Sequence, residues 1–181
     1  MNILPTAIPE VLLIEPRVFE DERGFFFESF RSDLLSEKVG FKVLFVQHNH
    51  SGSKKNVLRG LHYQLRHVQA KLVRVVVGSI YDVVVDIRRD SETFGKWVAY
   101  ELSAQNRRML WIPEGFAHGM LTLADWNEVI YATTNFYAPQ FERSILWSDP
   151  DLAIDWPLEE APTLSAKDAA GHCLNASEVL T

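Results

Sequence analysis

The most constraining feature of this sequence is a succession of short β-rich segments at close, regular spacing. Glycine, proline, asparagine, aspartate and serine separate these segments, and such residues end strands and form turns. Many short strands in this pattern predict an all-β sandwich or barrel of the jelly-roll type. The strands are expected at residues 11–16, 24–30, 42–50, 57–62, 72–77, 80–87, 97–102, 109–112, 119–122 and 128–136.

Two of these segments lie next to each other in the middle of the chain. Residues 72–77 and 80–87 are rich in valine and isoleucine, and only Gly78-Ser79 separates them. A two-residue turn that contains glycine is typical of a β-hairpin, so we expect these two strands to pair.

Helices have a small part in the expected fold. Residues 32–39 form the one clear helix of the body, with Ser32 as the N-cap and Gly40 as the C-cap. A second short helix is expected from residue 177 to the end. Because no helices connect successive strands, a parallel α/β sheet is not expected.

Length and charge limit the class of protein. The 181 residues suit one domain, with residues 157–181 as a tail that packs back on it. The net charge of −6 argues against a nucleic-acid surface, and no apolar run is long enough to cross a membrane. Cys173 is the only cysteine and the N-terminus lacks signal-peptide features, so a cytoplasmic protein is expected.

Three cationic or titratable residues suggest a site near one strand. Arg59 and His62 flank Gly60, which can break the strand alternation and let both side chains face one cavity, and Lys71 follows shortly. Together they could bind an anion, take a proton and stabilise a negative oxygen, which is chemistry next to a carbonyl. The alternatives are a structural histidine, a surface ion pair of Arg59 and a solvated lysine at a strand edge.

A second motif raises the question of a metal. Pro113-Glu114-Gly115-Phe116-Ala117-His118 resembles the second conserved motif of the cupin superfamily, and His48-Asn49-His50 resembles the metal-binding pair of its first motif. The glutamate that should follow is missing, because residues 51–55 offer only hydroxyls and cations. In a regular strand Gln47 and Asn49 would also face opposite to the two histidines. We therefore expect no metal.

Two tyrosines and an aspartate complete the candidates. Tyr131 and Tyr137 would share a face of a regular strand, where they could pack in the core or donate a proton into a pocket. Asp168 could fold back to orient His62, although an aspartate after Ser-Ala-Lys is also typical of a cap or turn.

Taken together, the motifs resemble those of the dTDP-4-dehydrorhamnose 3,5-epimerase family over nearly the whole chain. The most specific stretches are Asp21-Glu22-Arg23-Gly24-Phe25-Phe26, Leu58-Arg59-Gly60-Leu61-His62-Tyr63-Gln64, Lys71-Leu72-Val73-Arg74, Phe94-Gly95-Lys96-Trp97, Gly115-Phe116-Ala117-His118-Gly119 and Leu164-Ser165 with Lys167-Asp168.

This resemblance implies a cupin-type jelly roll, a homodimer, and a reaction without metal or organic cofactor. The implied substrate is dTDP-4-dehydro-6-deoxy-D-glucose, inverted at C3 and C5. His62 resembles the general base and Asp168 its orienting carboxylate. Lys71 would stabilise the enolate oxygen, and Tyr131 would return the proton.

The resemblance also implies contacts to the nucleotide. Arg59 and Arg23 resemble diphosphate ligands, and Phe19 and Phe26 would lie near thymine. Residues 23–28 would come from the partner subunit. The other implied ligand contacts are Glu28, Gln47, Asn49, His118, Tyr137, Glu142 and Lys167.

Three alternatives remain open from the sequence. They are an epimerase that acts at C3 only or C5 only, a metal-dependent cupin enzyme, and a sugar-nucleotide binding module without catalysis.

Overall fold

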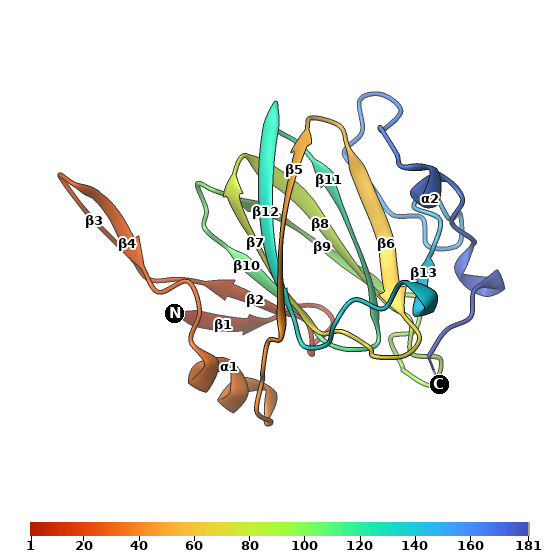
Figure 1. The fold of residues 1–181 in the computed structure, drawn as a ribbon, viewed down its shortest axis with the longest axis horizontal. Helices are drawn as coiled ribbons and strands as arrows, with labels where there is room; N and C mark the ends of the chain where they lie inside the picture. The colour runs from red at the N-terminus through yellow and green to blue at the C-terminus, as the bar shows by residue number, and fades with distance from the viewer. Residues whose placement is uncertain (181) are drawn as a thin grey trace.

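Two antiparallel sheets face each other in the computed structural model, which describes residues 1–180 (Figure 1). This all-β architecture confirms the predicted fold class. The six-stranded sheet has the order β1 (Asn2–Pro5), β2 (Leu12–Glu15), β10 (Met109–Ile112), β7 (Lys71–Val77), β12 (Trp126–Thr133) and β5 (Gln47–Lys54). The five-stranded sheet has the order β13 (Glu142–Ser144), β6 (Leu58–Gln64), β11 (Phe116–Thr122), β8 (Ser79–Asp86) and β9 (Trp97–Ser103).

The predicted pairing of the two central strands is wrong. β7 lies between β10 and β12, whereas β8 lies between β11 and β9 in the other sheet. Gly78, with φ of 76°, is the corner where the chain crosses between the sheets, and the Asn127 side chain accepts a hydrogen bond from Ser79 N there. A glycine turn lets the chain reverse or change sheets. Whether the chain reverses within one sheet or changes sheets depends on the strands available for pairing, which come from distant parts of the sequence.

A second small sheet protrudes from the body. β3 (Val18–Asp21) and β4 (Gly24–Phe27) form a hairpin that extends away from the two main sheets (Figure 1). β4 is the N-terminal part of the strand expected at 24–30, while β1, β3 and β13 have no counterpart in the prediction. Of the segment expected as a strand at 42–50, only the part from Gln47 onward belongs to a strand, β5.

The helices match the prediction in part. α1 (Ser32–Val39) has Gly40, with φ of 83°, as its C-cap, as expected, but its N-cap is Arg31 and not Ser32. Residues 177–180 are not helical, because Leu180 forms a parallel bridge with Arg88; Thr181 lies outside the described residues. The short helix α2 (Ala166–Ala169) has no counterpart in the prediction, nor do the 3-10 turns η1 (Pro139–Phe141) and η2 (Leu174–Ala176). No helix of residues 1–180 is long and apolar enough to cross a membrane.

Apolar side chains fill the space between the sheets and beneath the C-terminal segment. Val73, Val84 and Leu110 belong to the cluster between the sheets. A second cluster joins outward-facing residues of the five-stranded sheet, such as Leu61, to Trp156 of the C-terminal segment. That segment, blue in Figure 1, therefore covers the outer face of the five-stranded sheet and brings α2 next to β6.

A bulge in β6 brings Arg59 and His62 to the same side of the strand. His62 pairs with His118 and Arg59 pairs with Met120, so two residues of β6 lie opposite Gly119 alone. The extra residue turns Arg59 and His62 toward the same side, as the sequence predicted. Gly60 has φ of 108° and a Cβ atom there would lie 2.5 Å from the His118 carbonyl oxygen. Only glycine fits this position.

We predict that Gly60→Ala lowers the free energy of unfolding by about 3 kcal/mol or more, because positive φ and the clash with β11 add together. Gly24→Ala is the matched control, since Gly24 also has positive φ but nothing within 4 Å of an added Cβ. The control should lose about 1 kcal/mol. Guanidinium denaturation would measure both, and equal small losses would contradict the close approach at the bulge.

Candidate active site

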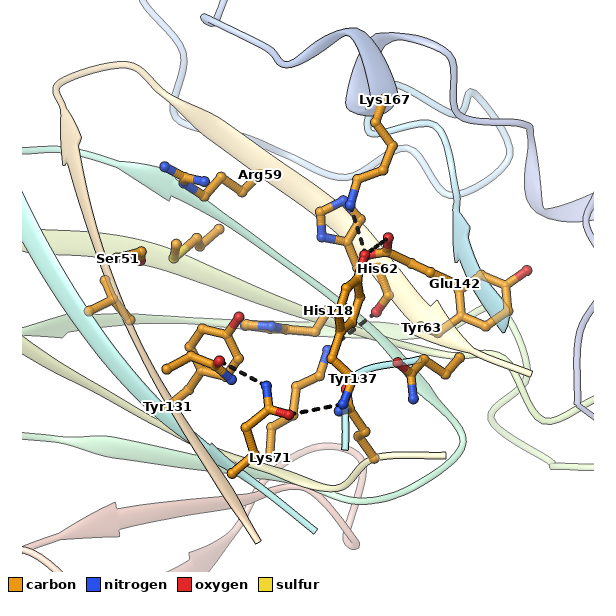
Figure 2. Close-up of a pocket in the computed structure, with 16 residues that line it drawn as sticks. Ser51, Arg59, His62, Tyr63, Lys71, His118, Tyr131, Tyr137, Glu142 and Lys167 are labelled. Carbon is orange, nitrogen blue, oxygen red and sulfur yellow. Dashed lines mark hydrogen bonds and ion pairs between the residues drawn. The ribbon is translucent and has the colours of Figure 1, made fainter. Parts of the chain in front are cut away.

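A cavity of about 330 Å³ opens between the two sheets. Its walls come mainly from β5, β6, β7, β11 and β12, with further side chains from the segment after β12 and from α2 (Figure 2). Of the residues that the sequence singled out, the cavity is lined by Gln47, Asn49, Arg59, His62, Lys71, His118, Tyr131, Tyr137, Glu142 and Lys167.

His62 is held by a carboxylate from the far end of the chain. Its Nε2 lies 2.5 Å from Asp168 Oδ1. An ionised carboxylate can only accept, so Nε2 carries the proton and Nδ1 is the nitrogen that can take another. Burial lowers the pKa of His62, and Asp168 partly opposes this shift. At neutral pH the imidazole is therefore uncharged, with its one proton on Nε2, and Nδ1 is suited to act as a base.

Asp168 is itself fixed by several donors. Besides His62, Ser165 Oγ donates to Oδ2 at 2.7 Å and Gly60 N donates to Oδ1 at 3.3 Å. Burial raises the pKa of this carboxyl, but the hydrogen bonds of His62 and Ser165 outweigh burial and bring the pKa to about 2. Asp168 thus remains a carboxylate throughout the range in which His62 titrates. Asp168 lies in the first turn of α2 and is not its cap, because the N-cap is Ser165, and its carboxylate faces the His62 imidazole.

Lys71 is a buried cation in the same cavity. Its residue exposure is only 8%, so the reading of a solvated edge lysine is wrong, and its Nζ lies 3.4 Å from the His62 carbonyl oxygen. Burial lowers the pKa of Lys71 to about 8, against the opposing effect of the Asp82 and Glu142 carboxylates. The ammonium is thus charged at neutral pH but poorly solvated, which favours interaction with a developing negative oxygen.

A second histidine–aspartate pair lies beside the first. His118 is the cross-strand partner of His62, and its Nε2 lies 2.6 Å from Asp82 Oδ1. Asp82 is fully buried, and its Oδ2 has no hydrogen-bond partner within residues 1–180. His118 was expected from the sequence, whereas Asp82 was not. The available signal was an aspartate inside the apolar strand at 80–87, where a charged residue is costly unless it serves a site.

Tyr131 projects from the opposite sheet. It lies on β12 of the six-stranded sheet, whereas His62 lies on β6 of the five-stranded sheet, and Figure 2 shows them on opposite sides of the cavity. Burial raises the pKa of Tyr131, so its hydroxyl keeps its proton. Tyr137 also reaches the cavity. It does not do so from a continuous strand shared with Tyr131, as expected, because β12 ends at Thr133 and Tyr137 lies in the segment that follows.

Polar side chains near Tyr137 are joined to one another by hydrogen bonds. Glu142 accepts from Tyr137 Oη at 2.8 Å and from Lys167 Nζ at 2.8 Å. Gln47 Oε1 accepts from Tyr137 N, and Gln47 Nε2 donates to Asn49 Oδ1. These groups can exchange their internal partners for the polar atoms of a ligand.

The strand β5 confirms the parity argument. Gln47 and Asn49 line the cavity, whereas His50 points away and lies 3.1 Å from Glu128 on the outer surface. Arg59 also lines the cavity, and its guanidinium donates to Ser53 Oγ rather than to a surface carboxylate.

The comparison with known proteins decides the family. The sequence model described as dTDP-4-dehydrorhamnose 3,5-epimerase matches residues 5–176. The chain is 57% identical to the dTDP-4-dehydrorhamnose 3,5-epimerase of Salmonella typhimurium, over 97% of this chain and 96% of the relative. The chain belongs to the dTDP-4-dehydrorhamnose 3,5-epimerase family.

Solved members of this epimerase family share the fold. A dTDP-6-deoxy-D-glucose-3,5-epimerase from Legionella pneumophila, solved with dTDP-4-keto-L-rhamnose, is 51% identical with a TM-score of 0.95, covering 98% of this chain and 94% of that chain. The 3'-monoepimerase ChmJ from Streptomyces bikiniensis is 34% identical with a TM-score of 0.90, covering 95% and 87%. The chain is therefore an isomerase with the cupin-like jelly roll that the sequence predicted.

Four residues that the epimerase resemblance assigned to ligand binding do not line this cavity. Phe19, Arg23 and Phe26 lie on the protruding hairpin, and Glu28 follows it. Arg23 is 85% exposed and pairs with Asp21, while Phe26 is 68% exposed. Glu28 pairs with Arg31. One chain by itself does not bring these side chains to His62.

Proposed function

We propose that this cavity inverts C3 and C5 of dTDP-4-dehydro-6-deoxy-D-glucose. The observation that carries the proposal is the placement of His62 and Tyr131 on opposite walls, with the buried cation of Lys71 in the same cavity. Inversion at carbon requires a base on one face and an acid on the other. The name of the family and the product bound to the Legionella relative support the choice of substrate.

The chemistry follows from the acidity of carbons beside a ketone. His62 Nδ1 takes the proton from C5 or C3, and the electrons of the broken C–H bond move to the C4 oxygen to give an enolate. The Lys71 ammonium stabilises that oxygen. The enolate then returns its electrons to the carbon, which takes a proton from Tyr131 on the opposite face.

Each inversion leaves the protein with its protons rearranged, not lost. His62 has gained a proton and Tyr131 has given one up, so exchange with solvent restores both before the second carbon reacts. The sugar keeps its oxidation level throughout. We therefore propose that the reaction uses neither a metal nor an organic cofactor, and, since Cys173 fits a reducing compartment, that it takes place in the cytoplasm.

The nucleotide-binding part of the site is complete only when a second copy of the chain contributes side chains to it. Arg59 supplies one cation for the diphosphate from within the cavity, and we propose that a second copy supplies Arg23 and the aromatic side chains of its β3–β4 hairpin. The protruding shape of the hairpin and its exposed phenylalanines support a homodimer in which each hairpin reaches its partner's cavity.

We predict that two substitutions separate the half-reactions. His62→Asn should abolish exchange of the C3 and C5 protons with deuterated solvent, because no base remains. Tyr131→Phe should keep slow exchange but lose inversion by at least about 100-fold. Proton NMR of the sugar measures both events. Full epimerisation by Tyr131→Phe, or full exchange by His62→Asn, would contradict the assigned roles.

The plot of kcat/KM against pH should be bell-shaped. His62 must be unprotonated, and since burial lowers its pKa, the rate should fall only as pH drops below about 6.5. Lys71 must be protonated, so the rate should fall as pH rises past about 8. Lys71→Gln should remove the alkaline limb and leave the acid limb. An alkaline limb near 10 or above would show that the titrating group is not this lysine.

Mixed dimers test the exchange of hairpins. Arg23→Ala and His62→Asn should each be nearly inactive alone. When the two variants are mixed and allowed to exchange subunits, one site of each mixed dimer combines His62 of one chain with Arg23 of the other. Random pairing should then restore about a quarter of the wild-type activity. No recovery in verified mixed dimers would mean that Arg23 does not serve the partner's cavity.

A further inference from the structure

The hydroxyl of Ser165 makes two hydrogen bonds to the same residue. As the N-cap of α2 it accepts from Asp168 N at 3.1 Å, and it also donates to Asp168 Oδ2 at 2.7 Å. The other carboxylate oxygen of Asp168 lies 2.5 Å from His62 Nε2. A continuous hydrogen-bonded chain therefore runs from Ser165 through Asp168 to His62.

This arrangement differs from ordinary capping. In a capping box the residue three positions after the N-cap reaches back to the N-cap backbone N–H. The Asp168 carboxylate instead faces the Ser165 hydroxyl and the His62 imidazole. α2 has only four residues, too few for a helix to be stable without tertiary contacts, so capping brings little stability here. The second bond of Ser165 serves the carboxylate, not the helix.

Within residues 1–180, the surroundings offer the Asp168 carboxylate no ready replacement for the hydrogen bond from the Ser165 hydroxyl. The Asp168 side chain is only 4% exposed, so water has little access to Oδ2 if the serine hydroxyl is removed. The segment is held on both sides of α2, by the bridge between Val57 and Thr163 and by the bridge between Ile145 and His172. Neighbouring atoms therefore cannot easily rearrange to replace the lost donor.

We propose that Ser165 is a positioning residue for the reaction. Its hydroxyl fixes which Asp168 oxygen faces His62 and draws part of the carboxylate charge away from the imidazole. This inference rests on the proposed role of His62 as the base. Ser165 acts only through Asp168, and the cavity lining does not include it.

The expected electrostatic effect has a definite sign. Without the Ser165 donor, more of the Asp168 charge is directed at His62, which then holds its proton more tightly. The other charged groups that act on His62 are Lys167 and Lys71, and both oppose its protonation; the Glu142 carboxylate also interacts with it. These three groups do not change in the variants below.

Three substitutions test the proposal in the full-length protein. Ser165→Ala removes the hydroxyl. Ser165→Gly also removes it but keeps a residue that helix N-caps tolerate well, so that a general failure of the cap is separated from loss of the donor. Ser165→Thr restores the hydroxyl. Ser177→Ala is the matched control, because this serine of the same C-terminal segment contacts the backbone oxygens of His172 and Cys173 and, within residues 1–180, makes no hydrogen bond to Asp168 or His62.

We expect Ser165→Ala and Ser165→Gly to exchange the substrate protons about 10- to 100-fold more slowly, with the dissociation constant for dTDP within about twofold of wild type. NMR titration should show the imidazole of His62 deprotonating at higher pH than in wild type. Ser165→Thr should recover to within a few-fold, and Ser177→Ala should match wild type.

Wild-type exchange in Ser165→Gly, or an unchanged His62 titration in a folded variant, would overturn the proposal. Failure of Ser165→Thr to recover would do the same. These outcomes are distinct from failure of the proposed function, which would appear as normal exchange in His62→Asn. If His62→Asn is inactive and Ser165→Gly is normal, only the role of Ser165 is wrong.

Discussion

The hydrogen bond between His62 and Asp168 joins two parts of the chain that are 106 residues apart, and the site depends on it. His62 belongs to a strand of the barrel wall, whereas Asp168 belongs to the C-terminal segment. The bond can form only after that segment has packed against the outer face of the five-stranded sheet. The apolar cluster around Leu61 and Trp156 therefore supports the site, because it helps to hold the Asp168 carboxylate beside the His62 imidazole.

The bulge at Gly60 lets β6 contact the C-terminal segment on one face and the cavity on the other. Leu61 points outward into the apolar cluster under the C-terminal segment, while Arg59 and His62 point inward to the cavity. In a regular strand Arg59 and His62 would face opposite sides. The Gly60 N–H also donates to Asp168, so the irregular backbone contributes directly to the environment of the proposed base, His62. A local departure from strand geometry thus places Arg59 and His62, the proposed anion-binding and proton-transfer groups, on the same side of the strand.

Much of the site could be predicted from the sequence, because its residues occur in short motifs whose chemistry is specific. The shared orientation of Arg59 and His62 and the outward direction of His50 followed from strand parity and from one glycine. The pairing of residues 72–77 with 80–87 was wrong, because turn residues do not reveal which distant strands compete for each edge. Asp82 and Ser165 were not singled out as site residues, since the sequence does not show their contacts with His118 and Asp168. The cap sequence around Ser165 accounts for one of its two hydrogen bonds and gave no sign of the other, to the Asp168 carboxylate.

The central claim is that one base and one acid, on opposite walls of the cavity, act on both carbons beside the ketone. Conversion of the sugar nucleotide in deuterated buffer tests this claim most directly. Proton NMR of the isolated product should show loss of the C3 and C5 proton signals, with deuterium at both carbons and inverted configuration at both. Deuterium and inversion at a single carbon would contradict double epimerisation. Inversion at either carbon without solvent deuterium would contradict proton transfer through His62 and Tyr131.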